Sequence, residues 1–182
     1  MVMPNTLPDW FSMPNTIGLL SALACAVMEL LKVWLTGKED HGGSEAHRGY
    51  PHLMYTLCPL CNSAAETARH LLETCSTARE VVAKLHHWWP LIPAPMGAYE
   101  DWISSPLVDD GGTRRSKIMG VIAKATLWGI WNARNNSIFS NKVSSTNVIV
   151  KEVKMLAFDW IKSRMKEYKS IGWESWVIKP MP

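Results

Sequence analysis

The sequence predicts a mainly α-helical protein, in which a small helical module is followed by a helical hairpin. Apolar residues recur every three or four positions in several segments, which is the period of one helix face. No segment keeps the alternation of apolar and polar residues that marks a half-buried strand. The chain of 182 residues, 47% of them apolar, is long enough to bury a sizeable core.

Residues 1–45 are expected to form a loop, an amphipathic helix and the start of a linker. Three prolines precede the helix, which the apolar spacing places at about 20–36. The run has the length of a membrane span, but Glu29 and Lys32 interrupt it, so no membrane association is expected. The glycine-rich stretch 37–49 has the composition of an exposed linker.

Cysteine and histidine are grouped in the next segment, 46–90. Cys58 and Cys61 stand in a Cys-x-x-Cys turn, which points two thiolates at one place. Eight residues separate Cys61 from His70 and four separate His70 from Cys75, so all four donors can converge. A tetrahedral set of this kind is typical of zinc. We therefore expect one zinc ion on Cys58, Cys61, His70 and Cys75, with a structural role because no coordination position stays open.

Two other interpretations of these cysteines stay open. They could be ordinary buried thiols beside a surface histidine, since free cysteine is commonly buried and inert. A redox pair is the other, although it expects a thioredoxin-like alternation of strands and helices that the sequence lacks. Two disulfides among the four cysteines are disfavoured, because no secretory signal precedes them. We expect an intracellular protein, with nucleus and cytoplasm not distinguished, and Cys25 has no partner spacing.

Capping-box patterns predict where the two helices of the module begin. They are Ser63 with Glu66, ahead of a helix at 67–74, and Thr77 with Glu80, ahead of a second helix that runs to Trp89 and stops at Pro90.

The rest of the chain divides into a linker and a tail. Proline and glycine are frequent in 91–113, which is typical of a linker without long regular elements. Residues 114–182 are expected to form a basic helical tail, with amphipathic helices at about 116–139 and 148–168 that pack as a hairpin.

Charge is unevenly divided along the chain. Residues 113–182 hold thirteen Lys and Arg against four Asp and Glu, a net of +9, while 1–112 hold six against twelve, a net of −6. A basic half is typical of contact with nucleic-acid phosphates, of docking on an acidic partner, or of solvated helix faces. The candidate contacts to an RNA or DNA backbone are Lys142, Lys151, Lys154, Lys162, Arg164, Lys166 and Lys169.

Several strings resemble the zinc-binding domain of reverse transcriptases from plant LINE-type (non-LTR) retrotransposons. They are Arg48-Gly49-Tyr50-Pro51, Cys58-Pro59-Leu60-Cys61, Glu66-Thr67, His70-Leu71-Leu72, Cys75, Arg79-Glu80-Val81, and in the tail Trp128-Gly129-Ile130-Trp131-Asn132-Ala133-Arg134-Asn135 with Ile138-Phe139. The resemblance covers roughly 46–182, although the family usually has Trp where Val82 stands. It implies the same four zinc ligands and a truncated C-terminal fragment of a retroelement reading frame, from the region downstream of the polymerase.

No enzyme is expected. The sequence lacks the phosphate-loop, nucleophile-elbow and zinc-protease motifs, and it has no aspartate pair in a polymerase-like setting. We predict an auxiliary nucleic-acid-binding domain without polymerase activity. The alternatives are a zinc-stapled protein-interaction or scaffold domain and a retroelement remnant with no selected function. The anchors of a protein interface would be those of Trp88, Trp89, Trp102, Trp173 and Trp176 that are exposed.

Overall fold

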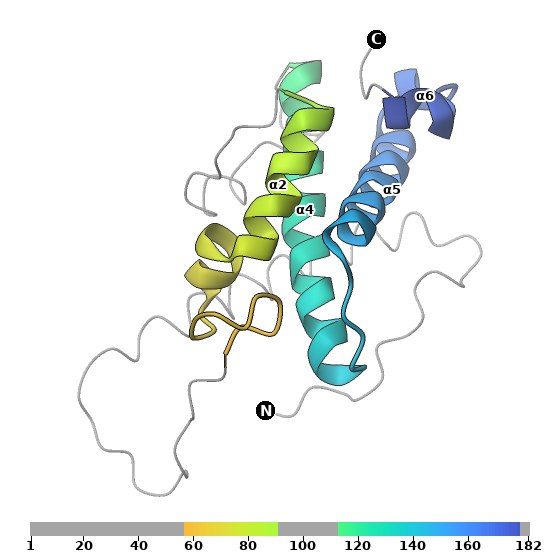
Figure 1. Cartoon of the computed structure of the whole chain (residues 1–182). Coiled ribbons are helices and arrows are strands. Elements are labelled where there is room, and N and C mark those ends of the chain that lie inside the picture. Colours follow the sequence, from red (N-terminus) through yellow and green to blue (C-terminus); the bar gives the residue numbers. More distant parts are fainter. Residues whose placement is uncertain (1–56, 91–112, 179–182) are drawn as a thin grey trace, which may run out of the picture.

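The computed structural model describes residues 57–90 and 113–178 (Figure 1). In these ranges the regular structure is helical, and strand pairing is limited to an isolated bridge between Leu57 and Ala65. The predicted mainly α fold is therefore confirmed. The expected N-terminal helix and the linker at 91–112, with Trp102, lie outside the described residues. None of the described helices is long and apolar enough to cross a membrane.

The first helical stretch begins later than the capping-box pattern predicts. Helical geometry starts two residues before the π-helical turn η1 (His70–Thr74). Thr67, not Ser63, takes the capping role, because its Oγ1 accepts the backbone N–H of His70 at 2.9 Å. Glu66 does not fold back onto this helix, because its carboxylate is engaged by another part of the chain.

Helix α2 (Ser76–Trp88) follows η1 directly. Thr77 was predicted as its N-cap, but it lies inside the first turn and donates its hydroxyl to the carbonyl of Leu60 at 2.9 Å. This bond pins the start of α2 to the Cys-x-x-Cys turn. The predicted end of the helix is confirmed to within one residue, two positions before Pro90, a residue that cannot continue a helix.

The predicted hairpin is present as α4 (Arg114–Phe139) and α5 (Thr146–Arg164). Each helix begins at a capping side chain: Thr113 accepts from the backbone N–H of Ser116 at 3.2 Å, and Ser145 accepts from that of Val148 at 3.4 Å. The two helices run antiparallel, and α2 packs against α5 (Figure 1).

Helix α4 is the central element. Between 118 and 130 it is buried on most of its circumference, because α5 covers one side and η1 packs on another. Gly129 permits the closest approach of α5, since a Cβ at this position would lie 2.6 Å from Cγ2 of Val153. Helix α5 also packs against α2, so one continuous core joins the three helices.

The chain ends with η2 (Lys166–Tyr168) and α6 (Trp173–Ile178), a short helix held by tryptophan. Trp88 Nε1 donates to the carbonyl of Val177 at 2.7 Å, and Trp176 Nε1 donates to the carbonyl of Lys154 at 3.0 Å. Trp176 is completely buried and Trp89 is 4% exposed, so neither is the exposed anchor that the sequence offered as a candidate. Trp88 and Trp173 are half-buried.

Candidate metal centre

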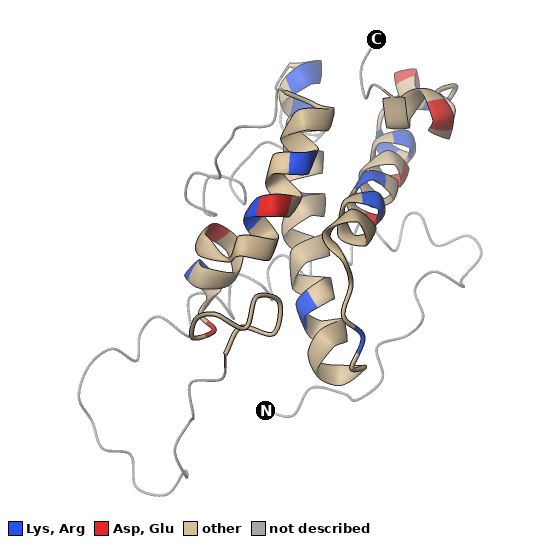
Figure 2. Ribbon diagram, in the orientation of Figure 1, with Lys and Arg blue, Asp and Glu red and all other residues tan. Residues whose placement is uncertain are grey.

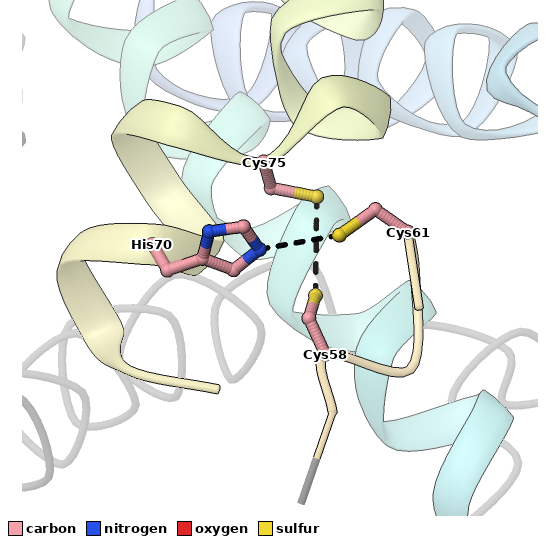
Figure 3. Close-up of side chains that lie close together, drawn as sticks. All are labelled: Cys58, Cys61, His70 and Cys75. Carbon is pink, nitrogen blue, oxygen red and sulfur yellow. Dashed lines mark hydrogen bonds between the residues drawn. The ribbon is translucent and has the colours of Figure 1, made fainter. Parts of the chain in front are cut away.

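Four side chains converge at the junction between the Cys-x-x-Cys turn, η1 and α2 (Figure 3). They are Cys58, Cys61, His70 and Cys75, and their donor atoms all lie within 4.8 Å of one another. Sγ of Cys58 is 3.9 Å from Sγ of Cys75, and Sγ of Cys61 is 3.2 Å from Nε2 of His70. The structure thus brings together the four residues that the sequence singled out.

The Cys-x-x-Cys turn is closed by its own backbone. The N–H of Asn62 donates to the carbonyl of Cys58 at 2.8 Å, and the N–H of Cys58 donates to that of Ala64 at 2.8 Å. Asn62 takes a φ of 52°, in the left-handed region that asparagine tolerates better than most residues. This turn reverses the chain sharply enough to aim both thiols of the motif at the same point.

The π-helical turn η1 brings His70 and Cys75 to the same side. The backbone N–H of Cys75 donates to the carbonyl of His70 at 2.7 Å, which is the i to i+5 bond of a π-turn. A turn of this width places residues five apart one above the other, whereas a regular α-helix would rotate them out of register. The π-turn therefore lets His70 and Cys75, which are separated by four residues, face the same centre.

Two hydroxyl groups hold the candidate ligands in orientation. Thr74 Oγ1 lies 3.0 Å from Nδ1 of His70, so Nδ1 can donate to it while Nε2 faces the centre. Ser63 Oγ donates to Sγ of Cys61 at 3.1 Å. Partners of this kind fix the imidazole tautomer and stabilise a thiolate.

The thiols differ in how readily they ionise. Burial raises the pKa of the Cys58 thiol to about 12, and the charge of Cys75 acts in the same direction, while backbone hydrogen bonds of Leu60 and Cys61 partly offset them. Burial also acts to raise the pKa of Cys61, but hydrogen bonds from the side chain and backbone of Ser63 and from His70 outweigh it and lower that pKa to about 6. Cys61 is thus the more acidic of these two thiols.

The donor set fits a metal ion that prefers tetrahedral sulfur and nitrogen ligands. Zinc–sulfur bonds of about 2.3 Å place two thiolates about 3.8 Å apart, which is close to the separation between Cys58 and Cys75. Cys58 and Cys75 are fully buried, while Cys61 and His70 are half-buried at the rim. The four side chains could hold one metal ion without moving either buried thiol into solvent.

An ion pair that sequence reasoning missed joins this centre to α4. Arg134 donates through Nε to Oε1 of Glu66 at 2.5 Å and through a terminal nitrogen to Oε2 at 2.9 Å. The two residues are 68 positions apart, so no local pattern reveals the pair. Glu66 and Arg134 each stand in one of the strings quoted above, but nothing in those strings pairs the two residues.

The predicted nucleic-acid contacts do not form one continuous site. Lys151, Lys154 and Lys162 share one face of α5, but the Nζ atoms of Lys154 and Lys162 lie over the rings of Trp88 and Phe158, at 4.4 Å and 5.0 Å from the ring centroids. Arg164 is half-buried at the end of α5. The exposed members are Lys142, Lys151, Lys166 and Lys169. Figure 2 shows cations along α5 and at the start of α4.

The metal centre is defined by its own four side chains, their separations and their hydrogen-bonding partners. Comparison of the chain with models of protein families, with curated proteins and with solved structures finds no match.

Proposed function

We propose that Cys58, Cys61, His70 and Cys75 bind one structural zinc ion in an auxiliary nucleic-acid-binding domain. The domain would be of the kind that follows the polymerase in LINE-type reverse transcriptases. The observation that carries the zinc assignment is the convergence of three thiols and one imidazole within 4.8 Å. Soft thiolate ligands in a tetrahedral arrangement favour zinc over magnesium, calcium or manganese.

The proposed role of the metal is structural. Four protein ligands complete the coordination of zinc and leave no position for water or substrate. The domain would therefore act by binding and not by catalysis, and it would contribute no polymerase activity of its own.

A metal assay tests the zinc assignment. Protein purified without added metal should contain about one zinc per chain, and Cys75→Ser should lose it because three ligands remain. Ser76→Ala is the matched control, since Ser76 is the exposed neighbour of Cys75. Stoichiometric iron in place of zinc, or full zinc retention in Cys75→Ser, would contradict the assignment.

Nucleic-acid binding is proposed from the charge of the tail. The segment 113–182 carries a net charge of +9, and four of its lysines, Lys142, Lys151, Lys166 and Lys169, are exposed. Exposed cations bind phosphates without reading sequence, and they release counterions as they do so. We therefore expect binding that tolerates many sequences and depends strongly on salt.

Salt dependence tests this binding. If the four exposed lysines contact phosphates, affinity for a short DNA duplex should fall about a hundredfold between 50 and 200 mM salt. Replacing these lysines by glutamine should abolish most of that dependence. Arg79→Gln, at an exposed position of α2, is the control for loss of charge elsewhere. Absence of binding to both duplex and single-stranded probes at 50 mM salt would overturn the proposal.

One observation favours a protein-binding role as the second candidate. Ile138, Phe139 and Val143, where α4 ends and the turn to α5 begins, are 45%, 66% and 76% exposed. Neighbouring exposed apolar side chains are a common mark of a protein interface. A partner held there would stay bound at high salt and be lost in Phe139→Ser.

A further inference from the structure

An open groove of about 730 Å³ lies between α2 and α5. Its walls include Ala83, His87 and Trp88 from α2 and Asn147, Val150 and Lys154 from α5. None of the four candidate metal ligands lines this groove. Its volume lies within the range of sites for small organic ligands, about 300–1,000 Å³.

The one acidic residue of the groove is already paired. Glu80 accepts from Lys84 at 2.8 Å and from the hydroxyl of Thr146 at 2.9 Å, and these hydrogen bonds lower its pKa. Lys84 also donates to Thr146 and, at 2.7 Å, to Asn147. This end of the groove is therefore a closed network that ties α2 to the first turn of α5.

Lys154 is the lysine of the groove that takes no part in this network. Its Nζ lies 4.4 Å from the centre of the Trp88 ring, and within the described part of the chain no carboxylate forms a salt bridge with it. The side chain is half-buried, and burial lowers its pKa. A half-buried ammonium that faces a groove without a counter-charge is a favourable place for an anion.

The remaining lining suits a ligand with both an anionic and a flat apolar part. Ala83 and Val150 present small apolar surfaces, and His87 stands on the same wall as Trp88. Lys151 is exposed on the same face of α5 as Lys154, so further phosphates of a chain could follow the helix.

We propose that this groove binds one nucleotide unit of a single-stranded nucleic acid, with its phosphate at Lys154 Nζ and its sugar and base against Ala83 and Val150. The assignment deepens the proposed nucleic-acid binding and rests on it. A single strand is specified because only an unpaired nucleotide can turn its base into a groove of the protein, whereas the bases of a duplex stay paired and stacked.

The test compares two lysines that carry the same charge in different places. Lys154→Met removes the groove cation and keeps an apolar stem over Trp88, while Lys166→Met removes an exposed charge outside the groove. Binding to an eight-nucleotide oligouridylate and to a twelve-base-pair DNA duplex is measured by fluorescence anisotropy at 50 mM salt. Lys154→Met should weaken single-strand binding about tenfold, and Lys166→Met about twofold.

A second variant fills the groove without changing charge. Ala83→Leu keeps a good helix former at an exposed position, so α2 should remain intact. It should weaken single-strand binding several-fold and leave duplex binding unchanged. Zinc content and thermal melting of each variant report whether the fold is retained.

The outcomes separate this inference from the proposed function. If Lys154→Met and Lys166→Met weaken single-strand binding equally and Ala83→Leu does not weaken it, the groove assignment is overturned, while nucleic-acid binding by the tail still stands. Tight binding of a hexaglutamate peptide that depends on Lys154 would also overturn it, in favour of an acidic protein. If neither nucleic-acid probe binds the unchanged protein, the proposed function itself fails and the groove assignment fails with it.

Discussion

Arg134 of α4 holds Glu66 in a bidentate ion pair, and the side chain of Glu66 is 3% exposed. The pair lies where the segment between the Cys-x-x-Cys turn and η1 meets the central helix. Arg134 also donates to the side chain of the neighbouring Asn135 at 2.9 Å, which orients the guanidinium. An ion pair, as well as apolar packing, thus attaches the segment with the four candidate ligands to the hairpin.

Breaking this pair should destabilise the protein substantially. Glu66→Gln removes the carboxylate charge that faces Arg134, whose side chain is only 14% exposed, and we expect a loss of about 2–3 kcal/mol in the free energy of unfolding. Urea unfolding of the zinc-loaded protein measures it. Arg69→Gln breaks a pair in which the arginine is 74% exposed, and it should cost under about 0.5 kcal/mol. Equal costs would show that burial of the pair is unimportant.

Gly129→Ala should destabilise the hairpin although alanine is the better helix former. The new methyl group would lie 2.6 Å from Cγ2 of Val153, a buried β-branched residue that cannot turn aside easily. Overpacking should outweigh the gain in helix propensity by about 1–2 kcal/mol in thermal or urea unfolding. Gly172→Ala, where nothing lies within 4 Å, should be close to neutral. The double variant Gly129→Ala, Val153→Ala should lose less unfolding free energy than the two single variants lose together, because the second substitution removes the methyl group that the first one meets. Strict additivity of the two losses would speak against the close contact.

Thr74→Val should weaken zinc binding without removing a ligand. The hydroxyl of Thr74 is the partner of His70 Nδ1 at 3.0 Å, and loss of such a partner lowers metal affinity about tenfold or more. Competition with a chromophoric chelator gives the affinity. Ser76→Ala, at a nearby exposed residue, serves as the control. An unchanged affinity in Thr74→Val would mean that the hydroxyl does not orient the imidazole.

Removal of the metal should lower thermal stability and loosen the segment from 58 to 75. Cys58 and Cys75 belong to the hydrophobic core, so the thiols left without a cation cannot simply turn to water. Chelation should lower the melting temperature and reduce the helical circular dichroism, and zinc should restore both where magnesium does not. Cys25→Ser should behave like the unchanged protein, because Cys25 lies outside the ligand set. A chelated protein that melts at the same temperature would refute a stabilising role.

The helices of the hairpin were predictable because their apolar period is strong and local. The sequence placed them at about 116–139 and 148–168, and they lie at Arg114–Phe139 and Thr146–Arg164. The second ends early because Met165 is extended, with a ψ of 110°, and the chain continues as η2. Likewise, the spacing of cysteine and histidine was enough to group the four side chains of the metal centre.

The capping residues and the side-chain environments were not predictable. Ser63 and Thr77 match a capping pattern, but Ser63 donates to a thiol and Thr77 to the carbonyl of Leu60. Both acceptors belong to the Cys-x-x-Cys turn, and a capping pattern does not show that the folded turn brings them within reach of these hydroxyl groups. For the same reason the sequence could not separate Lys154, half-buried over Trp88, from the exposed Lys166. Such distinctions depend on which helices meet.

The two indole hydrogen bonds at α6 imply that this end of the molecule can unfold separately from the metal centre. Six residues are too few to remain helical alone, so α6 depends on Trp88 and Trp176 for its shape. Trp88 stands at the far end of α2 from Cys75, about 20 Å along the helix axis. A protease that cuts between η2 and α6 would release the last helix and expose the indoles of Trp88 and Trp176 to water, while the proposed zinc ion stays bound. Tryptophan emission would then shift to the red while the zinc content stays unchanged, and the two measurements together would identify damage at the α6 end of the molecule.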